Sequence, residues 1–188
     1  PVRGDLQFSV RAIEAAGDGL WRKALEQTRL RLEKDGLLDP ARKRMLPAFP
    51  RRIAAITSPD GAALHDIITV ARSRSAAVEL VLVAGKGQGE GAPEWLGAAI
   101  ERVGRWADAD LLIIGRGGGS REDLWAFNDE RVARALAACP LPTISAVGHE
   151  VDISICDLVA DVRAATPSAA AEMAVPSRRE LVGRVESL

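Results

Sequence analysis

The chain has few of the residues on which disulfide-rich and zinc-stapled domains depend. Only two of its 188 residues are cysteines, Cys139 and Cys156, so neither a disulfide framework nor a four-cysteine zinc site can form. No apolar run approaches the roughly 20 residues that a bilayer-spanning helix needs. The first residues show no signal-peptide pattern. We therefore expect a cytoplasmic protein without a membrane partner.

Positive charge is scarce in the larger part of the chain. Residues 1–52 carry 12 Lys/Arg against 7 Asp/Glu, whereas residues 53–188 carry 13 against 19. This acidic balance argues against a broad electrostatic platform for nucleic acid after residue 52. Hydrophobic residues make up 47% of the chain and charged residues 27%, which excludes disorder as the main state and predicts one substantial core.

Short apolar runs alternate with helical stretches after residue 52. The runs at 53–57, 78–83, 111–114 and 143–147 do not alternate with polar residues, as expected for parallel strands that are covered on both faces. Helical patterns separate them at 61–73, 93–107 and 121–138. This order predicts an α/β fold with a mainly parallel sheet of four or slightly more strands and helices on both faces.

The two ends of the chain show different patterns. Residues 1–46 contain an alternating strand pattern at 6–10 and a helical pattern from Trp21 to Leu32, with Gly36 as its expected C-cap. We interpret this part as a remnant strand, a helix and a linker that follow another domain. Residues 47–176 form the α/β domain, and 177–188 begin a helix that we expect to continue beyond the sequence.

A glycine-rich segment after the third predicted strand is a candidate anion-binding site. Arg116 is followed by Gly117, Gly118, Gly119 and Ser120, and ligands of open α/β sheets bind beyond the carboxyl ends of the strands. Successive glycine N–H groups can form an anion-binding nest, to which Arg116 adds a forked cation. The alternative is a turn that only eases the packing of strand on helix.

Acidic and imidazole groups follow the first and fourth predicted strands. His149 comes after the fourth strand, and Asp152 is spaced to orient its imidazole. Asp66 lies early in the first helical stretch of the domain. Asp157 and Asp161 continue an acidic row that fits either a hard-metal site or an ordinary solvated helix face.

Four further residues have local interpretations. Trp125 follows the glycine-rich segment closely enough to stack on a nucleobase. The pair Asn128 and Asp129 is expected to restart a helix, and Ser168 is expected to N-cap the next one.

These segments, in this order, resemble the catalytic domain of the exodeoxyribonuclease VII large-subunit family over about residues 47–176. The matching residues occur in groups along the chain: Ile56-Thr57-Ser58, Gly61-Ala62-Ala63, Asp66, Gln88-Gly89, Gly115 to Ser120, Glu122 to Trp125, Phe127-Asn128, Gly148-His149-Glu150, Asp152, Asp157, Ala160-Asp161, Arg163-Ala164 and Thr166 to Ala170. Pro59-Asp60 departs from the small or hydroxyl residue that the family usually has there.

The resemblance implies hydrolysis of single-stranded DNA to short oligonucleotides. It implies Asp66, Arg116, His149 and Asp152 as catalytic residues, with Gly117 to Ser120 binding the phosphate. It also implies an OB-fold domain before residues 1–46. It further implies a coiled coil that starts at residues 177–188 and through which small subunits bind. We expect no required cofactor, although Mg²⁺ can stimulate, with Asp66 and Asp152 as its ligands if it is used.

Two rival functions use the same residues. A non-hydrolytic nucleotide or phosphometabolite binding module on a flavodoxin-like sheet would need the glycine nest but not His149. A metal-dependent phosphatase or kinase-like transferase would use the acidic row. Cleavage of a labelled single strand distinguishes all three.

Overall fold

The architecture is an α/β fold with all strands parallel. A computed structural model describes residues 18–85, 89–106, 108–116, 121–148, 153–177, 180 and 182–183. Its elements, in chain order, are α1 (Asp18–Lys34), η1 (Pro40–Arg42), β1 (Arg52–Thr57), α2 (Ala62–Arg74), β2 (Glu79–Ala84), α3 (Ala92–Arg105), β3 (Leu111–Gly115), η2 (Arg121–Asn128), α4 (Glu130–Ala138), β4 (Thr143–Ala146), α5 (Ile155–Val159), β5 (Val162–Arg163) and α6 (Pro167–Ala174).

The sheet has five strands in the order β2-β1-β3-β4-β5, and every neighbouring pair is parallel. The four predicted strands are confirmed, with bounds that shift by at most one residue. The edge strand β5 was not predicted, because two residues are too few to show a periodicity. It extends the sheet beside β4, where Ile144 pairs with Val162.

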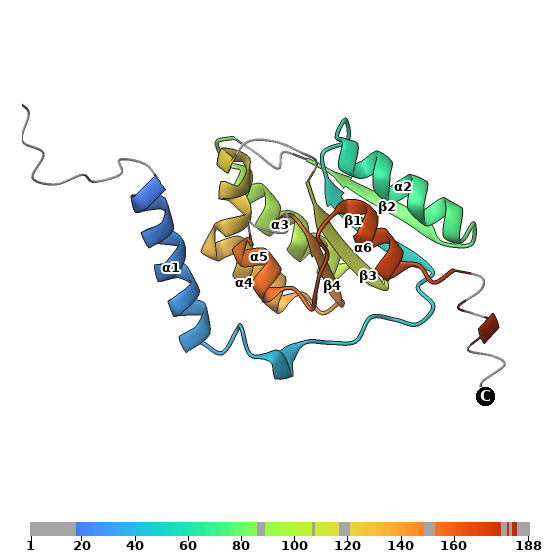
Figure 1. Cartoon of the computed structure of the whole chain (residues 1–188), viewed down its shortest axis with the longest axis horizontal. Coiled ribbons are helices and arrows are strands. Elements are labelled where there is room, and N and C mark those ends of the chain that lie inside the picture. The colour runs from blue at the N-terminus through green and yellow to red at the C-terminus, as the bar shows by residue number, and fades with distance from the viewer. Residues whose placement is uncertain are drawn as a thin grey trace, which may run out of the picture.

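Two helical layers cover the sheet, as the non-alternating strands predict (Figure 1). Helices α2 and α6 cover one face, where Ile53 and Ile113 point. Helices α3, α4 and α5 cover the other, where Ala54 and Ile114 point. Successive side chains of a strand point to opposite faces, so the side chains on both faces of a covered strand must be apolar. Accordingly, β3 is buried along its whole length.

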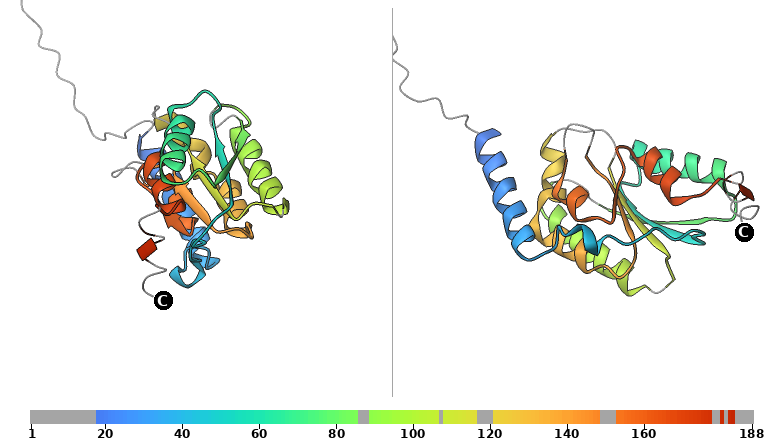
Figure 2. Two further views of the ribbon diagram at one scale, coloured as in Figure 1. Left: turned by 90° about the vertical axis from the view of Figure 1, so that its right-hand side faces the viewer. Right: turned by 60° about the horizontal axis from the view of Figure 1, so that its bottom comes forward.

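Helix α1 and the linker lie against the layer of α3, α4 and α5 (Figure 2). Leu32 of α1 is fully buried in that core. Gly36 follows α1 with a φ of 70°, which suits glycine, and Leu37 N donates to Leu32 O at 2.9 Å to close the helix end. The predicted C-cap is therefore confirmed, and the helix is anchored by packing rather than left as a free arm.

Two predicted helix details need correction. The stretch expected as one helix over 121–138 is divided into η2 and α4. Asp129 caps α4 by accepting a hydrogen bond from Arg131 N, which confirms the expected restart at this point. The N-cap of α6 is Thr166, whose hydroxyl accepts from Ala169 N, and not Ser168. Pro167 at the first helical position displaces the cap by two residues.

Some predicted elements lie outside the described residues. The strand at 6–10 is one of them, and so are Leu181, Val185 and Leu188 of the expected C-terminal helix. Within the described part of the chain, no helix combines the length and apolar character that crossing a bilayer requires.

Candidate active site at the carboxyl edge of the sheet

The three central strands bring the predicted site residues to one edge of the sheet. β3 lies between β1 and β4, so the residues that follow these strands are neighbours. The chain winds from β1 outward to β2, then returns to the other side of β1 to form β3. Such a reversal opens a crevice beyond the carboxyl ends of the two strands, and ligands of open α/β sheets bind there.

Arg116 stands at the centre of this edge. It follows Gly115, the last residue of β3, and its side chain is half-buried. Its backbone N–H donates to Ala146 O at the end of β4, at an N–O distance of 3.4 Å. The backbone that carries the Arg116 guanidinium is therefore held by both β3 and β4. Gly117, Gly118, Gly119 and Ser120 follow it and lie outside the described residues.

Asp66 lies near the same edge, because α2 begins there after β1. It lies in the second turn of α2, whose residues Ala63 and Ile67 are buried on the sheet. Asp66 itself is half-buried, on the flank of that buried face. Within the described part of the chain its carboxylate makes no hydrogen bond or ion pair, so it is available to a substrate, a water molecule or a metal ion.

A buried hydroxyl adds to the polar character of this edge. Thr57 ends β1, is 5% exposed, and its Oγ1 has no hydrogen-bond partner among the described residues. A buried polar atom without a hydrogen-bond partner is costly. Such atoms are found where a ligand or a water molecule supplies the missing hydrogen bond. Thr57 belongs to the first group of residues that carry the family resemblance, but a threonine at a strand end does not by itself indicate an unpartnered hydroxyl.

His149 and Asp152 lie outside the described residues, but the chain on both sides of them is fixed. Gly148 is buried directly after β4, and Ser154 is the N-cap of α5. Asp157 binds both of their backbone N–H groups. Asp157 is only 5% exposed, so its interpretation as part of a solvated helix face is wrong. The Asp157 carboxylate instead accepts hydrogen bonds within the protein.

A link between the two segments of the site was missed from the sequence. The Asn128 side chain at the end of η2 accepts from Ile155 N at 2.7 Å and donates to Leu124 O at 3.1 Å. It thereby ties the helix after the glycine-rich segment to the helix after His149 and Asp152. The available signal in the sequence is the pair Phe127-Asn128 in the family resemblance, and the capping interpretation of Asn128 does not predict this link.

Asp161 is also an internal residue, which corrects the second solvated-face interpretation. Its side chain is 5% exposed and pairs with Arg44 at 2.8 Å. It accepts as well from Thr143 N and Thr143 Oγ1 at 2.7 and 2.9 Å. Burial alone would raise its pKa, but the hydrogen bonds from Arg44 and Thr143 outweigh burial and hold that pKa below its ordinary value.

Replacing Asp161 with asparagine is expected to lower the free energy of unfolding at pH 7 by about 1–3 kcal/mol. The Asp161 pKa is lower in the folded than in the unfolded state, so its contribution is present above the unfolded value of about 3.9 and is lost as the pH falls further. Urea unfolding at pH 7 and pH 3 measures both effects. The variant should lose less stability between these pH values than the parent, and an equal loss would contradict the assignment.

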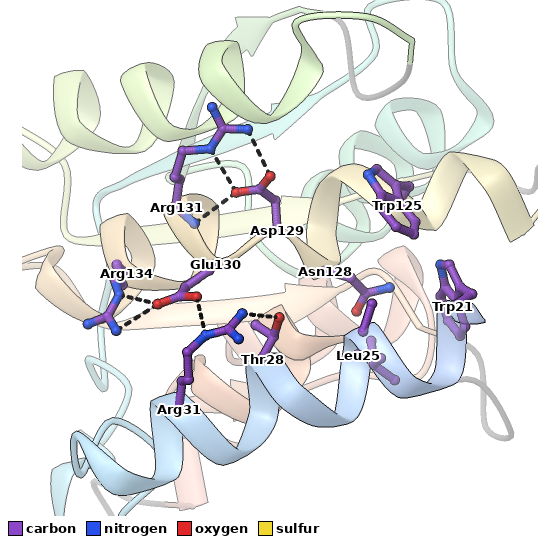
Figure 3. Close-up of a pocket in the computed structure, with 11 residues that line it drawn as sticks. Trp21, Leu25, Thr28, Arg31, Trp125, Asn128, Asp129, Glu130, Arg131 and Arg134 are labelled. Carbon is purple, nitrogen blue, oxygen red and sulfur yellow. Dashed lines mark hydrogen bonds and ion pairs between the residues drawn. The ribbon is translucent and has the colours of Figure 1, made fainter. Parts of the chain in front are cut away.

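A pocket of about 370 Å³ opens beside this site, between α1 and the segment η2–α4 (Figure 3). Trp21 of α1 and Trp125 of η2 lie at one end of it. At the other end Glu130 accepts from Arg31 and Arg134, both at 2.7 Å. The hydrogen bond from Arg134, and after it the one from Arg31, hold the pKa of Glu130 below its ordinary value. The pocket thus has an aromatic end and an ion-paired end.

The remaining candidates have structural roles or lie apart from the edge. Both cysteines are free and buried, and burial raises the pKa of the Cys156 thiol well above its ordinary value. Among the described residues, no group of three His, Cys, Asp or Glu side chains is placed to hold a metal ion. Asp66 is a described carboxylate near this edge that a metal ion could use, and Asp152 lies outside the described residues.

Comparison with known proteins shows to which family the chain belongs. A sequence profile described as "Exonuclease VII, large subunit" matches residues 37–188. Over its full length the chain is 53% identical to the exodeoxyribonuclease 7 large subunit of Syntrophotalea carbinolica and 54% identical to that of Moorella thermoacetica, and it spans 47% of each. It is 51% identical over 184 residues to the large subunit of Thioalkalivibrio sulfidiphilus and spans 41% of that protein.

The chain therefore spans somewhat less than half the length of these curated relatives. The matched residues 37–188 contain the whole sheet and every segment of the candidate site. With a profile match of this extent and identities above 50%, the chain belongs to the exonuclease VII large-subunit family.

Proposed function

We propose that this chain is the catalytic domain of an exonuclease that hydrolyses the phosphodiester bonds of single-stranded DNA to short oligonucleotides, as part of exonuclease VII. The observation that carries the proposal is the meeting of three segments at one sheet edge in a member of this family. Arg116 follows β3, Asp66 lies on α2 after β1, and Gly148, directly before His149, follows β4. A phosphodiester in the crevice would meet a cation, a carboxylate and an imidazole.

Each group has a role in the proposed hydrolysis. Arg116 and the N–H groups of Gly117 to Ser120 bind the scissile phosphate and stabilise the charge that develops on it. Asp66 positions or activates the water that attacks phosphorus. His149 serves as the general acid or base, with Asp152 orienting its imidazole. As an acid it donates a proton to the leaving oxygen while the bond from phosphorus breaks and Asp66 takes the proton of the attacking water; as a base it takes the proton of that water itself, and the leaving oxygen is protonated by solvent. No cofactor is required in this scheme, and Mg²⁺ is at most stimulatory.

The decisive experiment incubates the chain with a 5′-labelled single-stranded oligonucleotide and, in parallel, with the same sequence as a blunt duplex. The proposal requires short labelled products from the single strand and few from the duplex. A single strand that is bound but never cleaved would refute the hydrolase and favour the nucleotide-binding module. Cleavage of phosphomonoesters alone would favour a phosphatase.

The full-length protein is proposed to work with partners that this chain does not contain. The small subunits of exonuclease VII would bind through a coiled coil after residue 176, and an OB-fold domain before residues 1–46 would help to hold the DNA. A cytoplasmic location is supported by two buried cysteines that are both unpaired.

Trp125 is proposed to stack on a base of the bound strand, so Trp125→Ala is expected to weaken binding of oligo(dT) by about 5- to 100-fold. Trp125 is 52% exposed and lies a few residues after the glycine-rich segment. Fluorescence anisotropy at fixed salt measures the dissociation constant. Phe49→Ala is the matched control, because Phe49 is an exposed aromatic residue of the linker. Equal affinities of the two variants would show that Trp125 does not contact the bound strand.

A further inference from the structure

Asp157 is a buried charged group that the proposed mechanism does not use. It is the third residue of α5 and is 5% exposed. Ser145 Oγ donates to its Oδ1 at 2.5 Å, and the backbone N–H groups of Gly148 and Ser154 both donate to its Oδ2, at 3.2 and 2.8 Å. Burying a carboxylate is costly unless such donors satisfy it. Here the donors come from three separate places in the chain.

Two of these donors are the residues on either side of the segment that contains His149 and Asp152. Because Gly148 N and Ser154 N lie 3.2 and 2.8 Å from the same oxygen, they are at most about 6 Å apart. Six residues of extended chain can span about 20 Å. One side chain therefore holds together the points at which the chain enters and leaves this segment.

The third donor connects this clamp to the rest of the site. Ser145 belongs to β4 and pairs with Ile114 of β3, two residues before Arg116. The next residue of β4, Ala146, accepts the backbone hydrogen bond of Arg116. Hydrogen bonds to an ionised carboxylate are stronger than those to neutral acceptors, so the clamp fixes the ends of the segment relative to the strand that fixes Arg116.

We propose that Asp157 is a positioning residue, which sets the placement of His149 and Asp152 relative to Arg116 by clamping Gly148 and Ser154 to Ser145. The inference rests on the proposed function, because that function makes His149 and Asp152 catalytic residues. Consecutive Cα atoms are 3.8 Å apart, so a displacement of Gly148 is passed directly to His149. A misplacement of about 1 Å in a catalytic group can reduce a rate about 100-fold.

The test compares Asp157→Ala with Asp161→Ala in steady-state hydrolysis of single-stranded DNA. Asp161 is the matched control, since its side chain is also largely buried and holds Thr143 at the opposite end of β4. Both variants should lose stability. Asp157→Ala should lower kcat about 100-fold with KM nearly unchanged, and Asp161→Ala should stay within about threefold of the parent when both are folded. Asp157→Asn keeps an acceptor for both N–H groups and should recover most of the rate.

A second pair of variants decides the question if Asp157→Ala does not fold. Ser145→Ala and Thr143→Ala each remove one β4 hydroxyl that donates to a buried aspartate. Ser145→Ala should lower kcat about three- to tenfold at unchanged KM, and Thr143→Ala should not. Equal kcat within either folded pair would overturn the positioning role. A parent chain that cleaves no DNA would instead refute the proposed function, and this role with it.

Discussion

Replacing Arg116 with alanine is expected to reduce the rate of single-strand hydrolysis by about 100- to 1,000-fold, the usual effect of losing one preorganised donor to a transition state. Arg116 is well placed for such a role because its backbone is fixed between β3 and β4, and little reorganisation is needed when the phosphate arrives. The charge on a phosphodiester grows as the water attacks, so the loss should appear mainly in kcat.

Arg72→Ala is the matched control for this prediction. Arg72 is an exposed arginine in the last turn of α2, at the opposite end of that helix from Asp66. Its removal changes the net charge by the same amount but leaves the crevice untouched. If Arg116→Ala is folded by circular dichroism and cleaves as fast as Arg72→Ala, Arg116 is not catalytic. Arg116→Lys should recover only part of the rate, because an ammonium lacks the guanidinium fork.

The parts of the fold that could be predicted are those with a repeated physical signal. Buried parallel strands are apolar on both faces, so β1, β3 and β4 are visible as short uninterrupted runs. Gly61 and Gly91 mark the starts of α2 and α3, and Pro140 follows the end of α4. β5 has no such signal, since its two residues become a strand only through pairing with β4.

The sequence could predict which residues belong to the candidate site. It could not predict which residues hold the surrounding chain in place. The order of strands and helices places Arg116 and Asp66 at one sheet edge, whichever side chains surround them. The roles of Asp157 and Asp161 could not be predicted in the same way. Their spacing is that of a solvated helix face, and only the return of the chain from β4 through α5 buries them against Ser145 and Thr143.

The basic cluster before β1 illustrates the same limit. In the sequence, Arg42, Lys43 and Arg44 belong to a linker and have no evident partner. In the structure, Arg42 donates to Ala137 O and Lys43 donates to the carbonyls of Leu158 and Ala160. Arg44 pairs with Asp161. The charges of the linker thus hold it to the ends of α4 and α5, which composition alone cannot reveal.

Replacing Asp66 with asparagine is expected to lower kcat by about 100- to 10,000-fold, the range associated with loss of a general acid–base group. Asparagine has nearly the same shape but cannot take a proton from water. Because no described residue engages the Asp66 carboxylate, the substitution should leave the stability of α2 nearly unchanged. Glu172→Gln is the control, since Glu172 is an exposed carboxylate on α6, the helix that packs beside α2.

The same pair of proteins decides whether Asp66 acts on water or through a metal. Mg²⁺ often binds proteins through only one or two carboxylates and keeps several waters, so Asp66 and Asp152 together would suffice for a site. If Asp66 acts on water directly, the parent chain should still cleave DNA after exhaustive chelation, and added Mg²⁺ should not rescue Asp66→Asn. Activity that vanishes with chelator and returns only with Mg²⁺ would make Asp66 a metal ligand, and His149 would no longer be the centre of the mechanism.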